Sequence, residues 1–170
     1  GAARLVPTGT LTGGERIPTF EVLPAVCSKR VINRGLEGIT YTSNGRLYAV
    51  FQRPLANPDT ATSEGDPAVD PPIEPSCNTR IIEVNLVSLL MGGSDPVVRQ
   101  LLYRANSADK KVYASDIFAL STDTFLVPER KTDKLFAINI AGATDITPLE
   151  DEDGWLLSDP AKTVEQLDAD

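Results

Sequence analysis

The side chains of this sequence whose types and spacing could carry out chemistry are carboxylates and guanidinium groups. Glu37 is bracketed by two glycines at the entrance of an expected strand, where the backbone can bend sharply. Asp116 interrupts a second apolar segment, and Glu129 follows a third. Arg34 precedes Glu37 closely, and Arg130 directly follows Glu129. These places are the candidates for a functional site.

The overall composition excludes several kinds of site. The chain has no histidine, so it cannot supply a Ser-His-Asp triad, a histidine base or a histidine metal site. Any metal bound here should be a hard, oxygen-preferring ion such as calcium. The net charge of −8 argues against binding of nucleic acid, which needs a basic face, and against direct binding of a polyphosphate unless a divalent cation bridges the charges. No serine lies in a G-x-S-x-G setting, so no catalytic nucleophile is identified.

The same charged residues also have a purely structural interpretation. Arg34, Glu37, Glu129 and Arg130 could form buried ion pairs that only fix packing, because buried charges are usually paired. Asp116 could be a turn or capping carboxylate. The residues alone leave the structural and the functional interpretation open.

The two cysteines, Cys27 and Cys77, are too few for a zinc cluster. They either form a disulfide or remain as two free thiols. On the chain-entropy model, a bridge across a loop of about fifty residues would stabilise the fold by roughly 4 kcal/mol. A bridge would also indicate an oxidising compartment.

Short β-rich segments joined by tight turns predict an all-β fold. The strongest signal is the Asn44-Gly45 pair between residues 39–42 and 47–51, which predicts a hairpin with a type I′ turn. A helical turn is expected at 86–91 and a short helix near 165–167. No apolar run is long enough to span a membrane. Further strands are expected at 80–86, 97–103, 112–120, 124–127 and 134–140, with one or two short ones before Cys27.

Residues 54–78 differ from the rest of the chain, because six prolines alternate with acidic residues. Such a composition excludes central strands and regular helix. It predicts a long acidic, proline-rich surface loop. This insertion is either simply solvated or a lid over a site, since loops of this length in compact domains are often functional.

Six motifs follow one another along the chain, at residues 33–39, 47–52, 115–117, 125–130, 134–136 and 142–146. Together they resemble the phytase-like domain family, which is described as having esterase-like activity. The resemblance covers roughly residues 30–147. It implies a β-propeller of which 1–170 is the N-terminal portion, about half, as a fragment or a cleavage product. The remaining half, in the same protein or a second chain, would then be a partner.

The resemblance also implies a function. The Glu-Gly element at 37–38 is similar to one in calcium-dependent lactonase propellers, where carboxylates from several blades meet at one ion. By that likeness Glu37, Asp116 and Glu129 would be calcium ligands, and Arg34 and Arg130 would orient an anionic substrate. We expect a secreted or periplasmic hydrolase of a small ester or phosphoester, assisted by calcium. The alternative is a non-catalytic propeller scaffold that binds a ligand or a protein partner.

Overall fold

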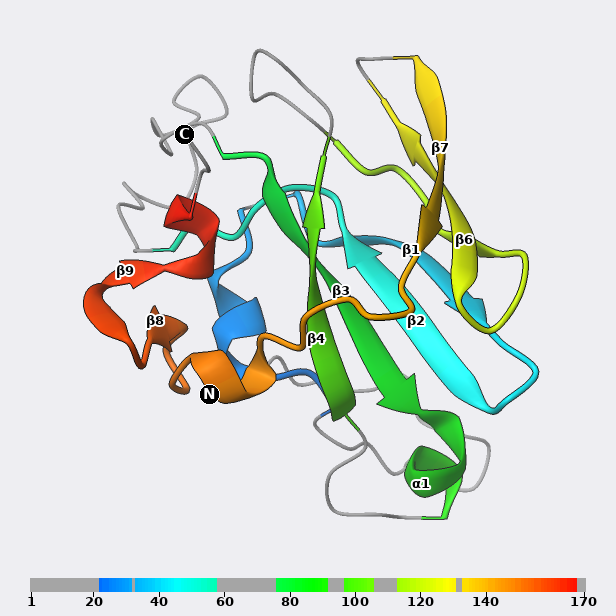
Figure 1. Ribbon diagram of the computed structural model, residues 1–170, viewed down its shortest axis with the longest axis horizontal. Coiled ribbons are helices and arrows are strands. Elements are labelled where there is room, and N and C mark those ends of the chain that lie inside the picture. The colour runs from blue at the N-terminus through cyan, green and yellow to red at the C-terminus, as the bar shows by residue number, and fades with distance from the viewer. Residues whose placement is uncertain are drawn as a thin grey trace, which may run out of the picture.

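The computed structural model describes residues 22–31, 33–57, 76–91, 97–105, 113–130 and 133–167. These residues form three antiparallel sheets with a few short helices, so the prediction of an all-β fold is confirmed (Figure 1). The strands are β1 (Leu36–Tyr41), β2 (Arg46–Phe51), β3 (Asn78–Asn85), β4 (Val97–Arg104), β5 (Phe118–Ala119), β6 (Thr124–Glu129), β7 (Lys134–Asn139), β8 (Trp155–Leu156) and β9 (Asp159–Thr163). The helices are η1 (Ala25–Lys29), α1 (Leu86–Leu90), η2 (Thr147–Leu149) and η3 (Val164–Gln166), of which the three η elements are 3₁₀-helices.

The largest sheet is a four-stranded meander in the order β1-β2-β3-β4. Its inner strand β3 is buried on both faces, and the buried side chains include the charged residues Arg80 and Glu83 as well as Ile81, Ile82 and Val84. Ile81 belongs to the core cluster on one face, and Ile82 belongs to the cluster under η1 on the other. A sequential four-stranded meander is the unit of a propeller blade. Among the described residues the structure shows no closed propeller.

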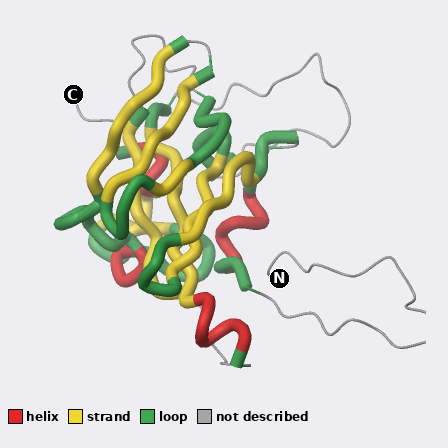
Figure 2. Tube along the Cα trace, turned by 90° about the vertical axis from the view of Figure 1, so that its right-hand side faces the viewer, coloured by secondary structure: helices red, strands yellow, loops and turns green. Residues whose placement is uncertain are grey.

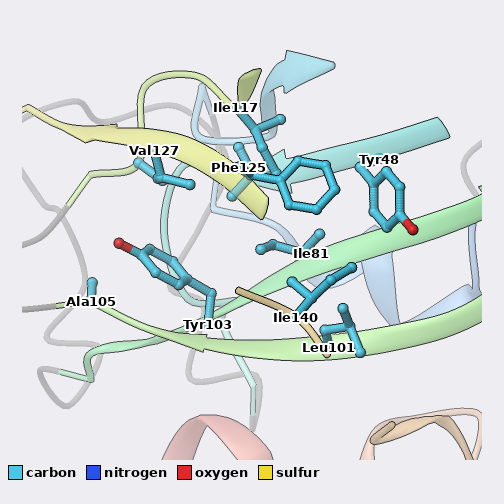
Figure 3. Packing of buried hydrophobic residues seen from close by; sticks show 11 residues of the cluster. Tyr48, Ile81, Leu101, Tyr103, Ala105, Ile117, Phe125, Val127 and Ile140 are labelled. Carbon is cyan, nitrogen blue, oxygen red and sulfur yellow. The ribbon is translucent and has the colours of Figure 1, made fainter. Parts of the chain in front are cut away.

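A second, three-stranded sheet in the order β5-β6-β7 packs against the first. Along its central strand, β6, partly buried and buried side chains alternate, and Phe125 and Val127 are completely buried. The ring of Phe125 meets that of Tyr48 edge to face, with centroids 4.6 Å apart (Figure 3). In the side view the strands of the two larger sheets form the body of the molecule, and the short helices lie at its margins (Figure 2). The sheet pair therefore encloses the main core.

The C-terminal part of the described chain adds a two-stranded sheet, β8-β9. Ile146, Leu156 and Val164 form a small third core cluster that packs against Leu102 of β4. The sequence did not predict β8, β9 or η2. The short helix expected near 165–167 is present as η3.

The hairpin predicted around Asn44-Gly45 is confirmed, but its turn type was wrong. Gly45 has a positive φ of 77°, whereas Asn44 is outside the positive-φ region. The amide of Gly45 donates to the carbonyl of Thr42 (3.0 Å), and the amide of Thr42 donates to the carbonyl of Arg46 (2.8 Å). The turn is therefore a three-residue loop with one glycine in the left-handed region. An Asn-Gly pair is compatible with this loop as well as with a type I′ turn. The Asn44 amide oxygen accepts from the Thr42 hydroxyl within the loop.

The strand predicted at 112–120 is largely wrong, because only Phe118–Ala119 is a strand. Residues 113–117 cross from one large sheet to the other and bond to both on the way. In the N-terminal region, residues 22–24 are not a strand and η1 follows them, while residues before 22 lie outside the described ones. Most of the predicted acidic loop, 58–75, also lies outside them. Its described ends, 54–57 and 76–77, are buried.

Candidate functional site

Four segments of the chain meet where the two large sheets join. The amide of Ala114 donates to the carbonyl of Gln52 at the end of β2 (3.0 Å), and Ala114 also pairs with Glu129 at the end of β6. The amide of Gln52 in turn donates to the carbonyl of Gly35 (2.9 Å). We call this place the junction. Its segments are residues 34–38, 52–53, 113–117 and 128–130, and they contain all five site residues predicted from the sequence.

Glu37 lies in a β-bulge at the start of β1. Leu36 pairs with Phe51 and Gly38 pairs with Val50, so Glu37 is the extra residue in the ladder. A bulge bends its strand and re-aims a side chain. The carboxylate of Glu37 is exposed. The bend expected from the two flanking glycines is therefore present.

Asp116 lies directly against the strand that carries Glu37. A Cβ added at Gly38 would be 2.5 Å from Oδ1 of Asp116 and 2.6 Å from its Cα, so only glycine allows this approach. The carboxylate of Asp116 is exposed and accepts a hydrogen bond from the amide of Ile117 (2.8 Å). The structure thus brings the backbones that carry two of the predicted carboxylates, Glu37 and Asp116, into contact at the surface of the junction.

Glu129 points the other way, into the core. It is 1% exposed, and its Oε1 accepts a hydrogen bond from the hydroxyl of Tyr103 (2.5 Å). Burial, together with the hydrogen bond to Glu129 and its charge, raises the pKa of Tyr103, so this hydroxyl keeps its proton. The carboxylate of Glu129 is therefore buried in the core, whereas those of Glu37 and Asp116 are exposed at the surface.

The donor set for a metal is limited. Within the part of the chain that the structure describes, no three or more acidic or cysteine side chains are grouped so that they could hold an ion. An ion bound by Glu37 and Asp116 would need additional oxygen ligands to reach the coordination that calcium prefers. Calcium binding by the predicted residues stays a prediction.

Guanidinium groups collect around one buried ring at the junction. Arg34 lies 5.2 Å and Arg53 lies 5.0 Å from the centre of the Tyr113 ring. Nη1 of Arg34 donates to Oε1 of the buried Gln52 (3.3 Å), and the backbone amide of Arg130 donates to the carbonyl of Tyr113 (2.9 Å). Both predicted arginines thus contact the junction, and the side chain of Arg130 is exposed. The junction thus holds three guanidinium groups in the same place as the three carboxylates Glu37, Asp116 and Glu129.

Sequence reasoning missed Arg53 and Tyr113. A signal for Arg53 exists, since Gln52-Arg53 after β2 has the same place as Glu129-Arg130 at the end of β6. Tyr113 carries no such signal, because its position between the two sheets is set by tertiary packing. Arg34 makes two contacts here, a hydrogen bond to Gln52 and a contact with the Tyr113 ring. Both partners are neutral groups.

Comparison with known proteins places this chain in a family. A family model described as Phytase-like, esterase-like activity of phytase, matches residues 4–169. The chain belongs to this family. No curated protein and no solved structure matches it. The phytase-like resemblance expected for residues 30–147 is confirmed and extends over nearly the whole chain.

The phytase-like chain also contains a buried charged network that the sequence did not suggest. Arg80 of β3 is completely buried and binds Glu150 through two hydrogen bonds of 2.5 and 2.9 Å. Its Nε donates to Glu165 (2.7 Å), and its Nη1 donates to Gln100 (3.0 Å). The carboxylates lie 70 and 85 residues further along the chain, so no local pattern could pair them with Arg80.

Both cysteines of the phytase-like chain are buried thiols that are not joined in a disulfide, so the structure contradicts the disulfide alternative. Cys27 packs with the cluster under η1, and burial raises its pKa to about 12. The thiols therefore give no indication of an oxidising compartment. No helix among the described residues has the length and apolar character needed to cross a membrane.

Proposed function

We propose that this phytase-like chain is a hydrolase of a small ester or phosphoester and that the junction is its site. The observation that carries the proposal is the arrangement at the junction. Two exposed carboxylates, Glu37 and Asp116, lie on touching backbones, and the guanidinium group of Arg34 is held at the same place. Membership of the esterase-like family supports the reaction class.

Each charged group has a role in this proposal. Arg34 and Arg130 bind the anionic part of the substrate, because guanidinium groups form paired hydrogen bonds with phosphate and carboxylate oxygens. Glu37 accepts a proton from a water molecule, whose oxygen attacks the ester carbon or the phosphorus. Asp116, whose Oδ1 already accepts a hydrogen bond from the amide of Ile117, helps to orient that water. The bond to the alcohol oxygen breaks, and the departing alcohol oxygen takes up the proton that the carboxylate accepted from the water. Glu129, buried against Tyr103, supports the junction from inside.

We also propose that the protein works outside the cytoplasm as part of a β-propeller. The family resemblance supports the location. The sequential meander β1-β2-β3-β4 supports the architecture. Large apolar side chains on β1, β5 and β7 are exposed, and further strands of a propeller would cover them; they are Ile39, Tyr41, Phe118 and Leu135.

The alternative proposal is a non-catalytic scaffold that binds an anionic ligand. Two observations favour it. Glu129 is used inside the core, and Asp116 already accepts a hydrogen bond from its own neighbouring amide. Binding without turnover would then depend on the arginines alone.

Hydrolysis of a chromogenic ester and a chromogenic phosphomonoester by the purified protein tests the proposal. The assay is run with added calcium and with a chelator. We expect turnover of at least one substrate and a KM raised about tenfold in Arg34→Gln, since one lost charge-assisted contact weakens binding by about that factor. Lys162 is an exposed cation paired with Asp159, and Lys162→Gln should have the same KM as wild type. If neither substrate is turned over under any condition, the hydrolase proposal is contradicted and the proposal of a binding scaffold remains.

A further inference from the structure

The buried network around Arg80 has one more carboxylate than it has cations. The side chain of Arg80 is 0% exposed, and those of Glu150 and Glu165 are each 2% exposed. Gln100, the fourth member, is neutral. If both carboxyl groups were ionised, the network would carry a net charge of −1 away from water, which is costly.

The hydrogen bonds show which carboxyl group is incompletely compensated. Both oxygens of Glu150 accept hydrogen bonds from Arg80, and Oε1 also accepts one from Nε2 of Gln100 (3.2 Å). Oε1 of Glu165 accepts from Nε of Arg80 (2.7 Å). Oε2 of Glu165 is buried and has no hydrogen-bond partner. A proton at this oxygen would remove the unbalanced charge.

We propose that Glu165 is protonated in the folded protein and that loss of this proton as pH rises weakens the attachment of the C-terminal segment, residues 146–167, to the four-stranded sheet. Glu165 lies in η3, and Arg80 is in the centre of β3. The Arg80–Glu165 contact therefore joins the end of the segment to the middle of the sheet. The titrating group lies at that connection.

The other groups that face Glu165 do not supply a second positive charge. Arg80 from β3 and Glu150 after η2 are the charged neighbours, and Cys27 from η1 is also close enough to interact electrostatically. The pKa of Cys27 is raised to about 12, so its thiol is neutral at neutral pH. Burial raises the pKa of Glu165 above its ordinary value despite the opposing effect of Arg80.

The sign of the pH dependence follows from that direction. Because the pKa of folded Glu165 lies above its unfolded value of about 4.5, its contribution to stability is fully present below that value. The contribution is lost as pH rises through the folded pKa. Other contacts of the segment do not titrate, including Nδ2 of Asn78 to the carbonyl of Val164 (3.0 Å) and the hydroxyl of Thr163 to the carbonyl of Asn57 (2.9 Å). Deprotonation should therefore weaken the attachment of the segment at the Arg80–Glu165 contact while these other contacts remain.

Proton release on unfolding tests the proposal directly. The wild-type protein is unfolded with urea in a weakly buffered solution at pH about 6, where ordinary carboxylates are already ionised and this histidine-free chain has no imidazole to titrate. We expect about one proton released per molecule. Glu165→Gln, which keeps the shape of the protonated acid, should release none. Glu152→Gln, at an exposed acid, should release as many protons as wild type.

The thermal midpoint between pH 5 and 8 gives a second readout. The midpoint of wild type should fall as pH rises, and that of Glu165→Gln should fall less. Release of no proton by the wild type would overturn the proposal, even if Glu165→Gln fails to fold. A midpoint that rises with sodium, potassium or calcium concentration, without proton release, would also overturn it, because a cation would then balance the charge.

Discussion

Gly38 is the residue whose size is most tightly constrained at the junction. A Cβ there would be 2.5 Å from Oδ1 of Asp116 and 2.6 Å from its Cα, and the backbone cannot move away cheaply. Gly38→Ala should lower the free energy of unfolding by about 1–3 kcal/mol or more, measured by urea denaturation. Gly35→Ala is the control, because its Cβ would meet only the flexible side chain of Arg30 at 3.2 Å. Equal losses in both variants would contradict the close packing.

The hydrogen bond between Tyr103 and Glu129 is a second constraint at this scale. Tyr103→Phe removes the hydroxyl that donates to a buried carboxylate oxygen. The variant should be destabilised by about 1–3 kcal/mol in chemical denaturation, because the oxygen loses this donor and stays buried. Tyr41→Phe, at a ring that is 71% exposed, should change stability little. A Tyr103→Phe protein as stable as wild type would show that the hydrogen bond contributes nothing.

Single residues were predictable where the constraint is local. Two glycines around Glu37 predicted the bend that became a bulge. The inward direction of Glu129 also had a signal that was not used. Phe125, Val127 and Glu129 alternate along β6, and residues two apart face the same side of a strand. Tyr113 had no signal, because its neighbours come from distant segments.

Among the elements, the hairpin of β1 and β2 depends on one turn residue. Gly45 has a φ of 77°, where a side chain is strained. Gly45→Ala should cost about 1–2 kcal/mol of folding stability in a thermal or urea melt. Ser43→Ala in the same loop, at an exposed position outside the positive-φ region, should cost little. Equal effects of the two substitutions would contradict the turn geometry.

Strand prediction succeeded where alternation and turn residues agree and failed where tertiary contacts decide. The strands β2, β3, β6 and β7 followed from periodicity. Residues 113–117 pass between two sheets, so their backbone hydrogen-bond partners do not lie in one ladder. The strand β9, with the sequence Asp-Pro-Ala-Lys-Thr, has no β pattern and exists because it pairs with β8.

Taken as a whole, the molecule is held together without a covalent cross-link between its cysteines. Cys27 and Cys77 are buried thiols that form no disulfide with each other. A thiol reagent should titrate two groups in denaturant and react slowly with the folded protein, because burial raises the pKa of Cys27 to about 12 and little thiolate forms. Reductant should leave the thermal midpoint unchanged. If no thiols can be titrated in denaturant, the two cysteines form a disulfide after all.

The relation between distant parts of the chain was the least predictable feature. The network that joins Arg80 to Glu150 and Glu165 links β3 to segments 70 and 85 residues away. The order of strands within each large sheet follows the sequence, but the packing of one sheet on the other does not follow from any local pattern. The propeller architecture remains a proposal for the same reason.

The central claim is that the junction is the working site of a hydrolase and that its exposed carboxylates take part in the reaction. The most direct measurement is kcat of Glu37→Gln beside Glu152→Gln on whichever ester or phosphomonoester the wild type hydrolyses. Loss of a general base lowers kcat by about 10² or more, so Glu37→Gln should fall by at least that factor. Glu152→Gln, which removes an exposed carboxylate away from the junction, should retain wild-type kcat. Equal kcat values in the two variants would contradict the claim.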